Sequence, residues 1–152
     1  MTIASPRLPA TSRTTAGRQS GVRAGVTAVT TTGKTVLVVD DSPAIHELVG
    51  AALGPAFRVL AAWHGDEGLA AAREHRPDLI LMDVEMPGLN GIEACRRLTA
   101  DPELSHIPVV IITGDSDPER WQQARAAGAA LLLPKPFSPA ALVAHARALV
   151  GA

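Results

Sequence analysis

The feature that most constrains the fold is a regular alternation of short apolar runs with longer segments of helical periodicity. The apolar runs, which we predict as strands, cover residues 35–39, 57–62, 79–82, 109–112 and 130–133. The segments predicted as helices cover residues 43–53, 66–75, 92–100, 118–127 and 139–150. A strand–helix–strand unit makes neighbouring strands parallel through a right-handed crossover. The pattern therefore predicts an α/β fold in which helices cover a mostly parallel five-stranded sheet on both faces.

The first helical segment shows the start and stop signals most completely. Ser42 and Pro43 provide a helix cap followed by proline at the first helical position. Gly54 and Pro55 end the segment. Between them the apolar residues recur at helical spacing and form a single stripe: Ile45, Leu48, Val49, Ala52 and Leu53. The segment is therefore predicted to be an amphipathic helix.

The distribution of charge limits the range of functions. The formal net charge is −1, but residues 1–39 contain no Asp or Glu, and all fifteen acids lie from Asp40 onward. An acidic domain argues against a nucleic-acid surface, which needs a basic face to displace counterions from phosphates. No apolar run approaches the roughly 20 residues needed to cross a bilayer. We therefore expect no nucleic-acid binding, no membrane insertion and a cytoplasmic location.

Residues 1–33 differ in composition from the rest of the chain. They are rich in Thr, Ser, Ala, Gly and Arg, contain few large apolar side chains and show no periodicity. Such a segment buries too little apolar surface to offset its ordering entropy. We predict a disordered basic leader at 1–33 and one folded domain at 34–150. The Arg-rich, acid-free composition also resembles an organellar transit peptide, but a flexible leader or an over-extended start is the favoured interpretation.

Residues that carry chemistry stand at the ends of four of the five predicted strands. In an open parallel sheet the carboxyl ends of the strands form one edge, where ligands bind. The residues at these ends are Asp40 and Asp41, Asp83, Thr113 and Gly114, and Lys135. The sequence therefore predicts that three carboxylates, a hydroxyl and an ammonium group meet at a single edge of the sheet.

The types of these residues point to phosphoryl chemistry. Three carboxylates at one site raise each other's pKa unless a cation is present, and oxygen ligands suit Mg²⁺. The ammonium group of Lys135 and the hydroxyl of Thr113 are suitable donors to phosphoryl oxygens. We therefore predict metal-assisted phosphoryl transfer onto a carboxylate. Taken alone, Asp40 and Asp41 could instead be an acid cluster at a helix N-terminus, and Thr113 could be an ordinary strand-end threonine.

Four motifs, each at the end of a predicted strand, strengthen this interpretation. They are VLVVDDS at 36–42, DVEMPGLNG at 83–91, ITG at 112–114 and LPKPF at 133–137. In this order they resemble the receiver domains of two-component response regulators, and the resemblance spans Lys34 to about Val150. It implies a flavodoxin-like, doubly wound α/β fold with five helices and a five-stranded parallel sheet in the order 2-1-3-4-5. It also implies a signalling switch rather than a conventional enzyme, one that catalyses its own phosphoryl transfer and dephosphorylation.

The resemblance implies a role for each acidic residue. Asp83 is the expected phosphoacceptor, which attacks a phosphohistidine on a sensor histidine kinase or phosphotransfer protein and forms an acyl phosphate. Asp41 and Asp83 are expected to bind Mg²⁺ directly, Asp40 largely through water, and Glu85 through its backbone carbonyl.

The remaining site residues are expected to bind the phosphate. Lys135 pairs with the acceptor carboxylate and then with the phosphoryl group, while Thr113 swings toward the phosphate. Gly114 follows Thr113 in this phosphate-binding and switch set. The family also carries a cis peptide after the lysine, which the X-Pro bond Lys135–Pro136 makes accessible.

Two positions depart from the family pattern. The family usually places an aromatic residue three positions before the lysine, and its ring moves with the threonine. This position is Leu132 here, and the chain contains no tyrosine, so the usual route of the signal to the surface is missing. The second position is Glu85, which we expect to tune the lifetime of the acyl phosphate through its charge beside the path of the attacking water.

Three functions are compatible with the motifs to different degrees. Only Gly151 and Ala152 follow Val150, so we expect a stand-alone receiver, a single-domain response regulator, whose changed surface binds a downstream protein. A haloacid-dehalogenase-like phosphatase would want an aspartate two residues after the nucleophile, where this chain has Glu85. A pseudo-receiver that binds partners without phosphorylation is the third alternative; the intact acid, threonine and lysine set argues against it, and Leu132 leaves it open.

Overall fold

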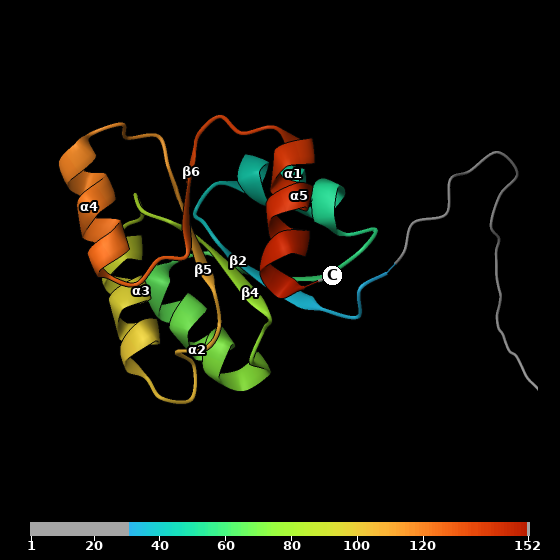
Figure 1. Ribbon diagram of the computed structural model, residues 1–152, viewed down its shortest axis with the longest axis horizontal. Coiled ribbons are helices and arrows are strands. Elements are labelled where there is room, and N and C mark those ends of the chain that lie inside the picture. The colour runs from blue at the N-terminus through green and yellow to red at the C-terminus, as the bar shows by residue number, and fades with distance from the viewer. Residues whose placement is uncertain (1–30, 152) are drawn as a thin grey trace, which may run out of the picture.

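The computed structural model describes residues 31–151, in which five strands and five helices alternate strictly (Figure 1). The strands are β2 (Thr35–Val39), β3 (Arg58–Ala62), β4 (Leu79–Asp83), β5 (Val109–Thr113) and β6 (Leu131–Pro134). The helices are α1 (Pro43–Leu53), α2 (Gly65–His75), α3 (Gly91–Ala100), α4 (Pro118–Ala126) and α5 (Pro139–Val150). All ten predicted elements are present, and no end differs from its predicted position by more than one residue. The predicted leader lies largely in residues 1–30, outside the described part of the chain.

The five strands form one parallel sheet in the order β3-β2-β4-β5-β6. Counted along the described chain, this is the predicted order 2-1-3-4-5. The register pairs Val39 of β2 with Met82 of β4, and Asp83 of β4 with Ile112 of β5. The central strands therefore end at nearly the same level, and the residues at their carboxyl ends share one edge of the sheet.

Helices pack on both faces of the sheet (Figure 1). On one face α1 and α5 cover a core that includes Val38, Leu81 and Leu142. On the other face α2, α3 and α4 cover a core that includes Met82 and Leu98. Because the central strands are buried on both faces, they are apolar along almost their whole length. No helix within residues 31–151 is long and apolar enough to span a membrane.

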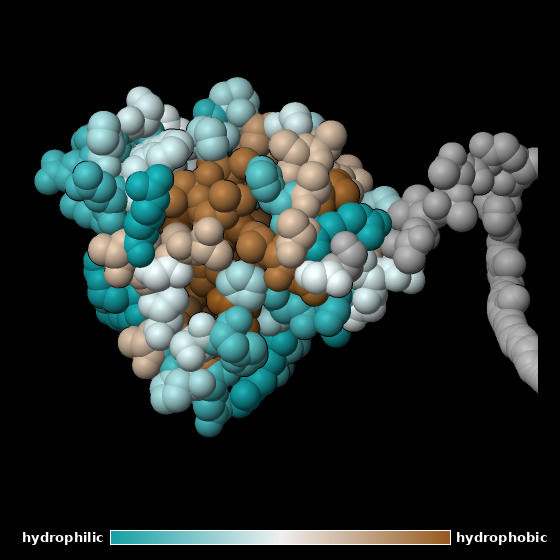
Figure 2. Space-filling view, viewed as in Figure 1, coloured by the Kyte–Doolittle hydropathy of each residue, from teal (hydrophilic) through white to brown (hydrophobic). Residues whose placement is uncertain are grey.

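The edge strand β6 is covered less completely than the central strands. It runs between α4 and α5 in Figure 1, and Figure 2 shows apolar residues gathered at the surface between these two helices. Leu131 and Leu132 of β6 are half-buried, and only Leu133 is fully buried. Like the other edge strand, β3, β6 is therefore covered less completely than the central strands of the sheet.

One glycine sets the path of the chain directly behind the site. The backbone N–H of Gly91, the first residue of α3, donates a hydrogen bond to the carbonyl of Val84 over 3.1 Å. A Cβ atom at Gly91 would lie 2.0 Å from the backbone oxygen of Asp83. Any side chain at this position would displace the end of β4, so the connection between β4 and α3 requires glycine.

Candidate functional site

Three carboxylates meet at the edge where β2 and β4 end. Asp83 is the last residue of β4, and Asp40 and Asp41 directly follow β2. One oxygen from each side chain lies within 4.8 Å of the other two. Asp40 and Asp83 are 0% and 2% exposed, whereas Asp41 is exposed to solvent. The structure thus brings together the three acids that were predicted to converge.

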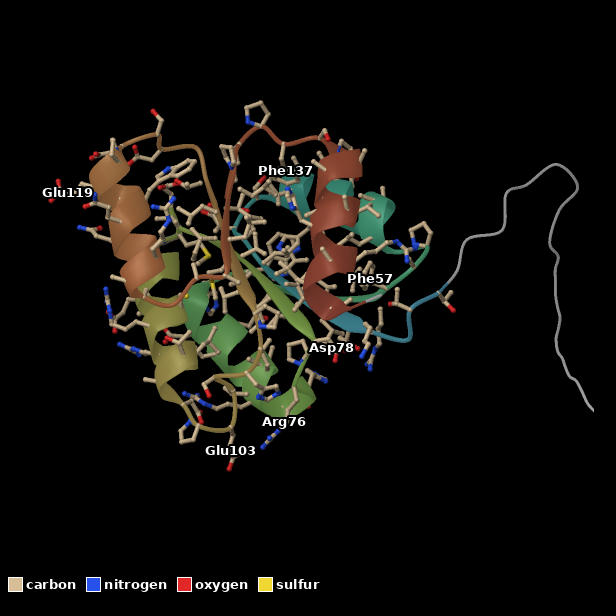
Figure 3. The ribbon with its side chains drawn as sticks, in the orientation of Figure 1. Phe57, Arg76, Asp78, Glu103, Glu119 and Phe137 are labelled. Carbon is tan, nitrogen blue, oxygen red and sulfur yellow. The ribbon has the colours of Figure 1, made fainter. Side chains whose placement is uncertain are left out.

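Acids elsewhere in the fold do not belong to this group. Asp78 precedes β4 at the opposite edge of the sheet, where its Oδ2 accepts a hydrogen bond from the backbone N–H of Thr35 over 2.8 Å. In Figure 3, Phe137, which is close in sequence to Lys135, lies in the upper part of the view, and Asp78 lies well below it. Asp78 and Asp83, at the two ends of the β4 segment, therefore have different roles. Asp78 holds the amino end of β2 in place, and Asp83 faces the site.

Lys135 reaches the buried acids from the connection between β6 and α5. Its Nζ donates a hydrogen bond to Asp83 Oδ1 over 3.1 Å and forms an ion pair with Asp40 Oδ2 at 3.4 Å. Its backbone N–H donates to the carbonyl of Thr113 over 2.8 Å, and the Lys135–Pro136 peptide is cis. The ammonium group is therefore the cation that pairs with both buried carboxylates.

The electrostatic balance of the site disfavours ionised Asp83. Burial and the charge of Asp40 raise the pKa of Asp83 from 3.8 to about 6, and the hydrogen bond and charge of Lys135 offset only part of this rise. Burial alone would lower the pKa of Lys135, but its hydrogen bond to Asp83 and the charges of Asp83 and Asp40 raise it overall. A single lysine thus compensates incompletely for two buried carboxylates.

This incomplete compensation fits a divalent cation. Asp40 Oδ2 is buried and, apart from its ion pair with Lys135, accepts no hydrogen bond within the described part of the chain, although a buried carboxylate oxygen normally accepts one. Oxygen donors from Asp40, Asp41 and Asp83 surround this position, and Mg²⁺ prefers such donors. The residues present therefore fit the predicted magnesium site, in which the backbone carbonyl of Glu85 is a further expected ligand.

Thr113, the last residue of β5, directs its hydroxyl toward Glu85. The side chain is 1% exposed, and its Oγ1 donates to Glu85 Oε2 over 3.3 Å. Oγ1 of Thr113 also accepts a hydrogen bond from the backbone N–H of Asp115 over 3.0 Å. Gly114, between them, is exposed. Thr113 and Gly114 therefore lie at the same edge as the acids, and the carboxylate of Glu85 accepts the hydrogen of the threonine hydroxyl.

Sequence reasoning missed an arginine that contacts this group. Arg120, in the first turn of α4, places Nη1 3.8 Å from Glu85 Oε2 and Nε 3.9 Å from Asp115 Oδ2. The indole N–H of Trp121, the next residue of α4, donates to the backbone oxygen of Asp115 over 2.8 Å. Glu85 lies in the motif at 83–91, but Arg120, Trp121 and Asp115 belong to no motif, and an ion pair between α4 and the β4–α3 loop has no spacing signal along the chain.

Leu132, at the position where the family usually has an aromatic residue, lies in the middle of β6. It is half-buried and packs against the core on the α2–α3–α4 face of the sheet. Its register partner in β5 is Ile111. The side chain is therefore part of an apolar contact surface and offers no polar group to the site.

The fold and site define a class of signalling protein, and comparison with known proteins identifies it. The sequence model of the response regulator receiver domain matches residues 36–147. This chain belongs to the response regulator receiver family, whose members act as switches in two-component systems. The match favours the receiver interpretation over a haloacid-dehalogenase-like phosphatase.

Two curated relatives show the extent of the sequence similarity. The chain is 41% identical over 114 residues to the DNA-binding response regulator MtrA of Mycolicibacterium smegmatis, a match that covers 74% of this chain and 49% of MtrA. It is 48% identical over 79 residues to the protein PilH of Pseudomonas aeruginosa, which covers 51% of this chain and 65% of PilH. The matched region thus spans about half of MtrA and just under two thirds of PilH.

Two solved structures confirm the predicted fold. The chemotaxis protein CheY4 of Vibrio cholerae superposes with a TM-score of 0.73 at 33% identity, over 77% of this chain and 98% of CheY4. The receiver domain of the sensor histidine kinase PA1611 of Pseudomonas aeruginosa superposes with a TM-score of 0.73 at 28% identity, over 79% of this chain and 99% of that domain. That receiver domain has a magnesium ion coordinated in its active site cleft.

Proposed function

We propose that this chain is a phosphorylation-switched receiver that takes a phosphoryl group onto Asp83 from a histidine kinase or a phosphotransfer protein. The position of Asp83 carries the proposal. Its carboxylate is buried at the end of β4, 3.1 Å from Lys135 Nζ and beside Asp40. A nucleophilic carboxylate, a cation for the transferred group and a metal-binding acid pair are thereby available at one point.

The proposed transfer exchanges one bond to phosphorus for another. An oxygen of Asp83 forms the new bond to phosphorus, and the phosphorus–nitrogen bond of the donor phosphohistidine breaks. The bonding electrons return to the donor imidazole, which takes up a proton, and the product is an acyl phosphate. Lys135, which is already hydrogen-bonded to Asp83, then donates to the phosphoryl oxygens, and the hydroxyl of Thr113 turns toward the same group.

The site residues also fit a role for Mg²⁺ in this transfer. Asp41 and Asp83 would bind the ion directly, Asp40 through water, and Glu85 through its backbone carbonyl. When bound, Mg²⁺ neutralises the carboxylates and the phosphoryl oxygens, whose mutual repulsion would otherwise oppose the approach of the donor. The raised pKa of Asp83, and the buried oxygen of Asp40 that accepts no hydrogen bond, support this proposal.

We also propose that the acyl phosphate is hydrolysed at the same site, with Glu85 affecting the rate. The carboxylate of Glu85 is half-exposed and lies beside Thr113, where a water molecule would approach the phosphorus atom. A negative charge at this position disfavours an anionic transition state and influences the lifetime of the signal.

The proposed output is a contact with another protein. We place the receiver domain at 34–150, and propose that it acts in the cytoplasm. Residues 40–152 carry fifteen acids against nine Lys and Arg, so this part of the chain lacks the basic surface that nucleic acid requires. DNA binding, named for MtrA, is therefore not proposed for this chain.

Intact mass measurement after incubation with acetyl phosphate and Mg²⁺ tests the proposal directly. We expect the wild type to gain one phosphoryl group, Asp83→Asn to gain none, and chelation of Mg²⁺ to prevent the gain. Asp66→Asn is the matched control, because Asp66 lies in the first turn of α2, outside the site; it should be phosphorylated like the wild type. A wild type that gains no phosphoryl group, or Asp83→Asn that still does, would reject Asp83 as the acceptor and favour a pseudo-receiver.

A further inference from the structure

A chain of polar contacts leads from the switch threonine to helix α4. Thr113 donates to Glu85 Oε2 over 3.3 Å, and the same oxygen lies 3.8 Å from Nη1 of Arg120. Arg120 Nε in turn lies 3.9 Å from Asp115 Oδ2, on the loop that follows Thr113. The guanidinium group of Arg120 therefore contacts the carboxylates of both Glu85 and Asp115.

The amino-terminal turn of α4 is tied to this group more closely than the rest of the helix. Asp117 caps the helix and accepts a hydrogen bond from the N–H of Glu119, and Trp121 donates to the backbone oxygen of Asp115. Figure 3 shows Glu119, by contrast, pointing away from the molecule. A displacement of Glu85 or of the loop after Thr113 would therefore act first on the turn that contains Arg120.

The hydroxyl of Thr113 cannot serve two acceptors at once. It carries a single hydrogen, which in this structure is donated to Glu85. If the hydroxyl turns to a phosphoryl group on Asp83, Glu85 loses that hydrogen bond. The phosphoryl group also adds negative charge, between about 1.5 and 2 units at neutral pH, which repels the nearby carboxylate. Both effects release Glu85 from the site and leave Arg120 as its partner among these residues.

We propose that Arg120 is a positioning residue that couples the phosphorylation of Asp83 to α4, through its ion pairs with Glu85 and Asp115. The inference rests on the proposed function of Asp83. In this proposal ion pairs carry the signal from Thr113 to α4, whereas family members usually use an aromatic ring at the position of Leu132. Phosphorylation breaks the Thr113–Glu85 hydrogen bond, Glu85 moves with its arginine partner, and the first turn of α4 takes a new position.

Backbone amide signals of the full-length chain test this coupling. Spectra of ¹⁵N-labelled protein are recorded with Mg²⁺, before and after addition of beryllofluoride, a stable mimic of the phosphoryl group. The amide of Gly114 reports the movement of Thr113, and the amides of Gln122 and Gln123 report the movement of α4. In the wild type we expect both sets of signals to shift.

Substitution of Arg120 should separate these two responses. In Arg120→Gln we expect the Gly114 shift to persist. We expect the α4 shifts to fall by roughly two- to fivefold, because loss of two exposed ion pairs changes the ratio of the two α4 positions by about that factor. Glu85→Gln removes only the first of these two ion pairs and should give a smaller loss. The double variant should lose no more than Arg120→Gln alone, because removal of Arg120 already breaks the pair with Glu85. Full α4 shifts in Arg120→Gln, or additive losses in the double variant, would overturn the proposal.

The control and the internal reporter distinguish the possible failures. Arg125→Gln removes the same charge from α4, one turn after Trp121, at a residue that has no ion pair with Glu85; it should keep the wild-type α4 shifts, and an equal loss there would show a general charge effect. If Gly114 does not shift in the wild type, the proposed phosphorylation switch fails. If Gly114 shifts but α4 responds equally with and without Arg120, only the coupling fails.

Discussion

Replacing Asp83 by asparagine tests the electrostatic balance of the site without any partner protein. The pKa of Asp83 is raised from 3.8 to about 6, so ionisation of this carboxyl at neutral pH costs the folded state about 3 kcal/mol, at about 1.4 kcal/mol per pH unit. Asparagine has the shape of the protonated acid and carries no charge. We therefore expect Asp83→Asn to raise the free energy of unfolding by up to about 3 kcal/mol in metal-free buffer at about pH 7.5.

The raised pKa also fixes the sign of the pH dependence. Below pH 3.8 the wild-type carboxyl is protonated in both the folded and the unfolded state, and the variant should have little advantage. Between pH 3.8 and about 6 the unfolded chain loses the proton first, so the wild type loses stability relative to the variant as the pH rises. Above about pH 6 the difference should stay constant.

Urea unfolding followed by circular dichroism, with a chelator present, measures this difference. Added Mg²⁺ should stabilise the wild type more than the variant and reduce the gap, because the ion binds the folded carboxylates. Asp66→Asn, at an exposed position, should change stability by no more than about 0.5 kcal/mol. The reasoning is refuted if Asp83→Asn is no more stable than the wild type near pH 7.5, or if its advantage does not shrink in acid.

Three further substitutions test other parts of the site. Gly91→Ala should lower the free energy of unfolding by about 1–3 kcal/mol, because its Cβ would meet the Asp83 carbonyl at 2.0 Å; an unchanged urea midpoint would contradict this. Lys135→Met should lower it by about 1–3 kcal/mol in metal-free buffer, because Asp40 and Asp83 lose their shared cation, and added Mg²⁺ should restore most of the loss; equal stability without metal would argue against the pairing. Glu85→Asn should change the rate at which the phosphorylated chain loses its phosphoryl group, followed by intact mass after removal of the donor, and an unchanged rate would reject a role for Glu85 in hydrolysis.

The fold could be predicted because most elements carry their own local signal. The helix cap predicted at Ser42 is present, and its hydroxyl accepts from the N–H of Ile45. The same arrangement occurs at the start of α5, where the hydroxyl of Ser138 accepts from the N–H of Ala141. Strand ends were less accurate, since an apolar run stops at its first polar residue whereas backbone pairing continues past it. Asp83, paired with Ile112, was for this reason predicted to follow a strand of which it is the last residue.

The acids and the lysine could be predicted to converge because parallel topology brings strand ends to one edge. That argument needs only the order of the elements and the residue type at each end, and it placed Asp83 and Lys135 together across 52 positions of sequence. The contact of Arg120 with Glu85 could not be predicted in this way. It depends on the rotation of α4 about its axis and on the path of the loop after β4, neither of which leaves a periodic pattern in the chain.

Because the coupling through Arg120 depends on charge, salt should weaken it, whereas a coupling through side-chain packing should not respond to salt. The side chains of Arg120, Glu85 and Asp115 are each at least 36% exposed, so salt screens their attraction, and the Debye length falls from about 30 Å at 0.01 M to about 3 Å at 1 M ionic strength. Thr113 is buried and would bind the phosphoryl mimic by a short-range hydrogen bond. We therefore expect the α4 amide shifts caused by beryllofluoride to be smaller at high salt, while the Gly114 shift persists. An aromatic or aliphatic route that works by packing is indifferent to salt, so equal α4 shifts at both ionic strengths would mean that the signal travels through the apolar surface of β6.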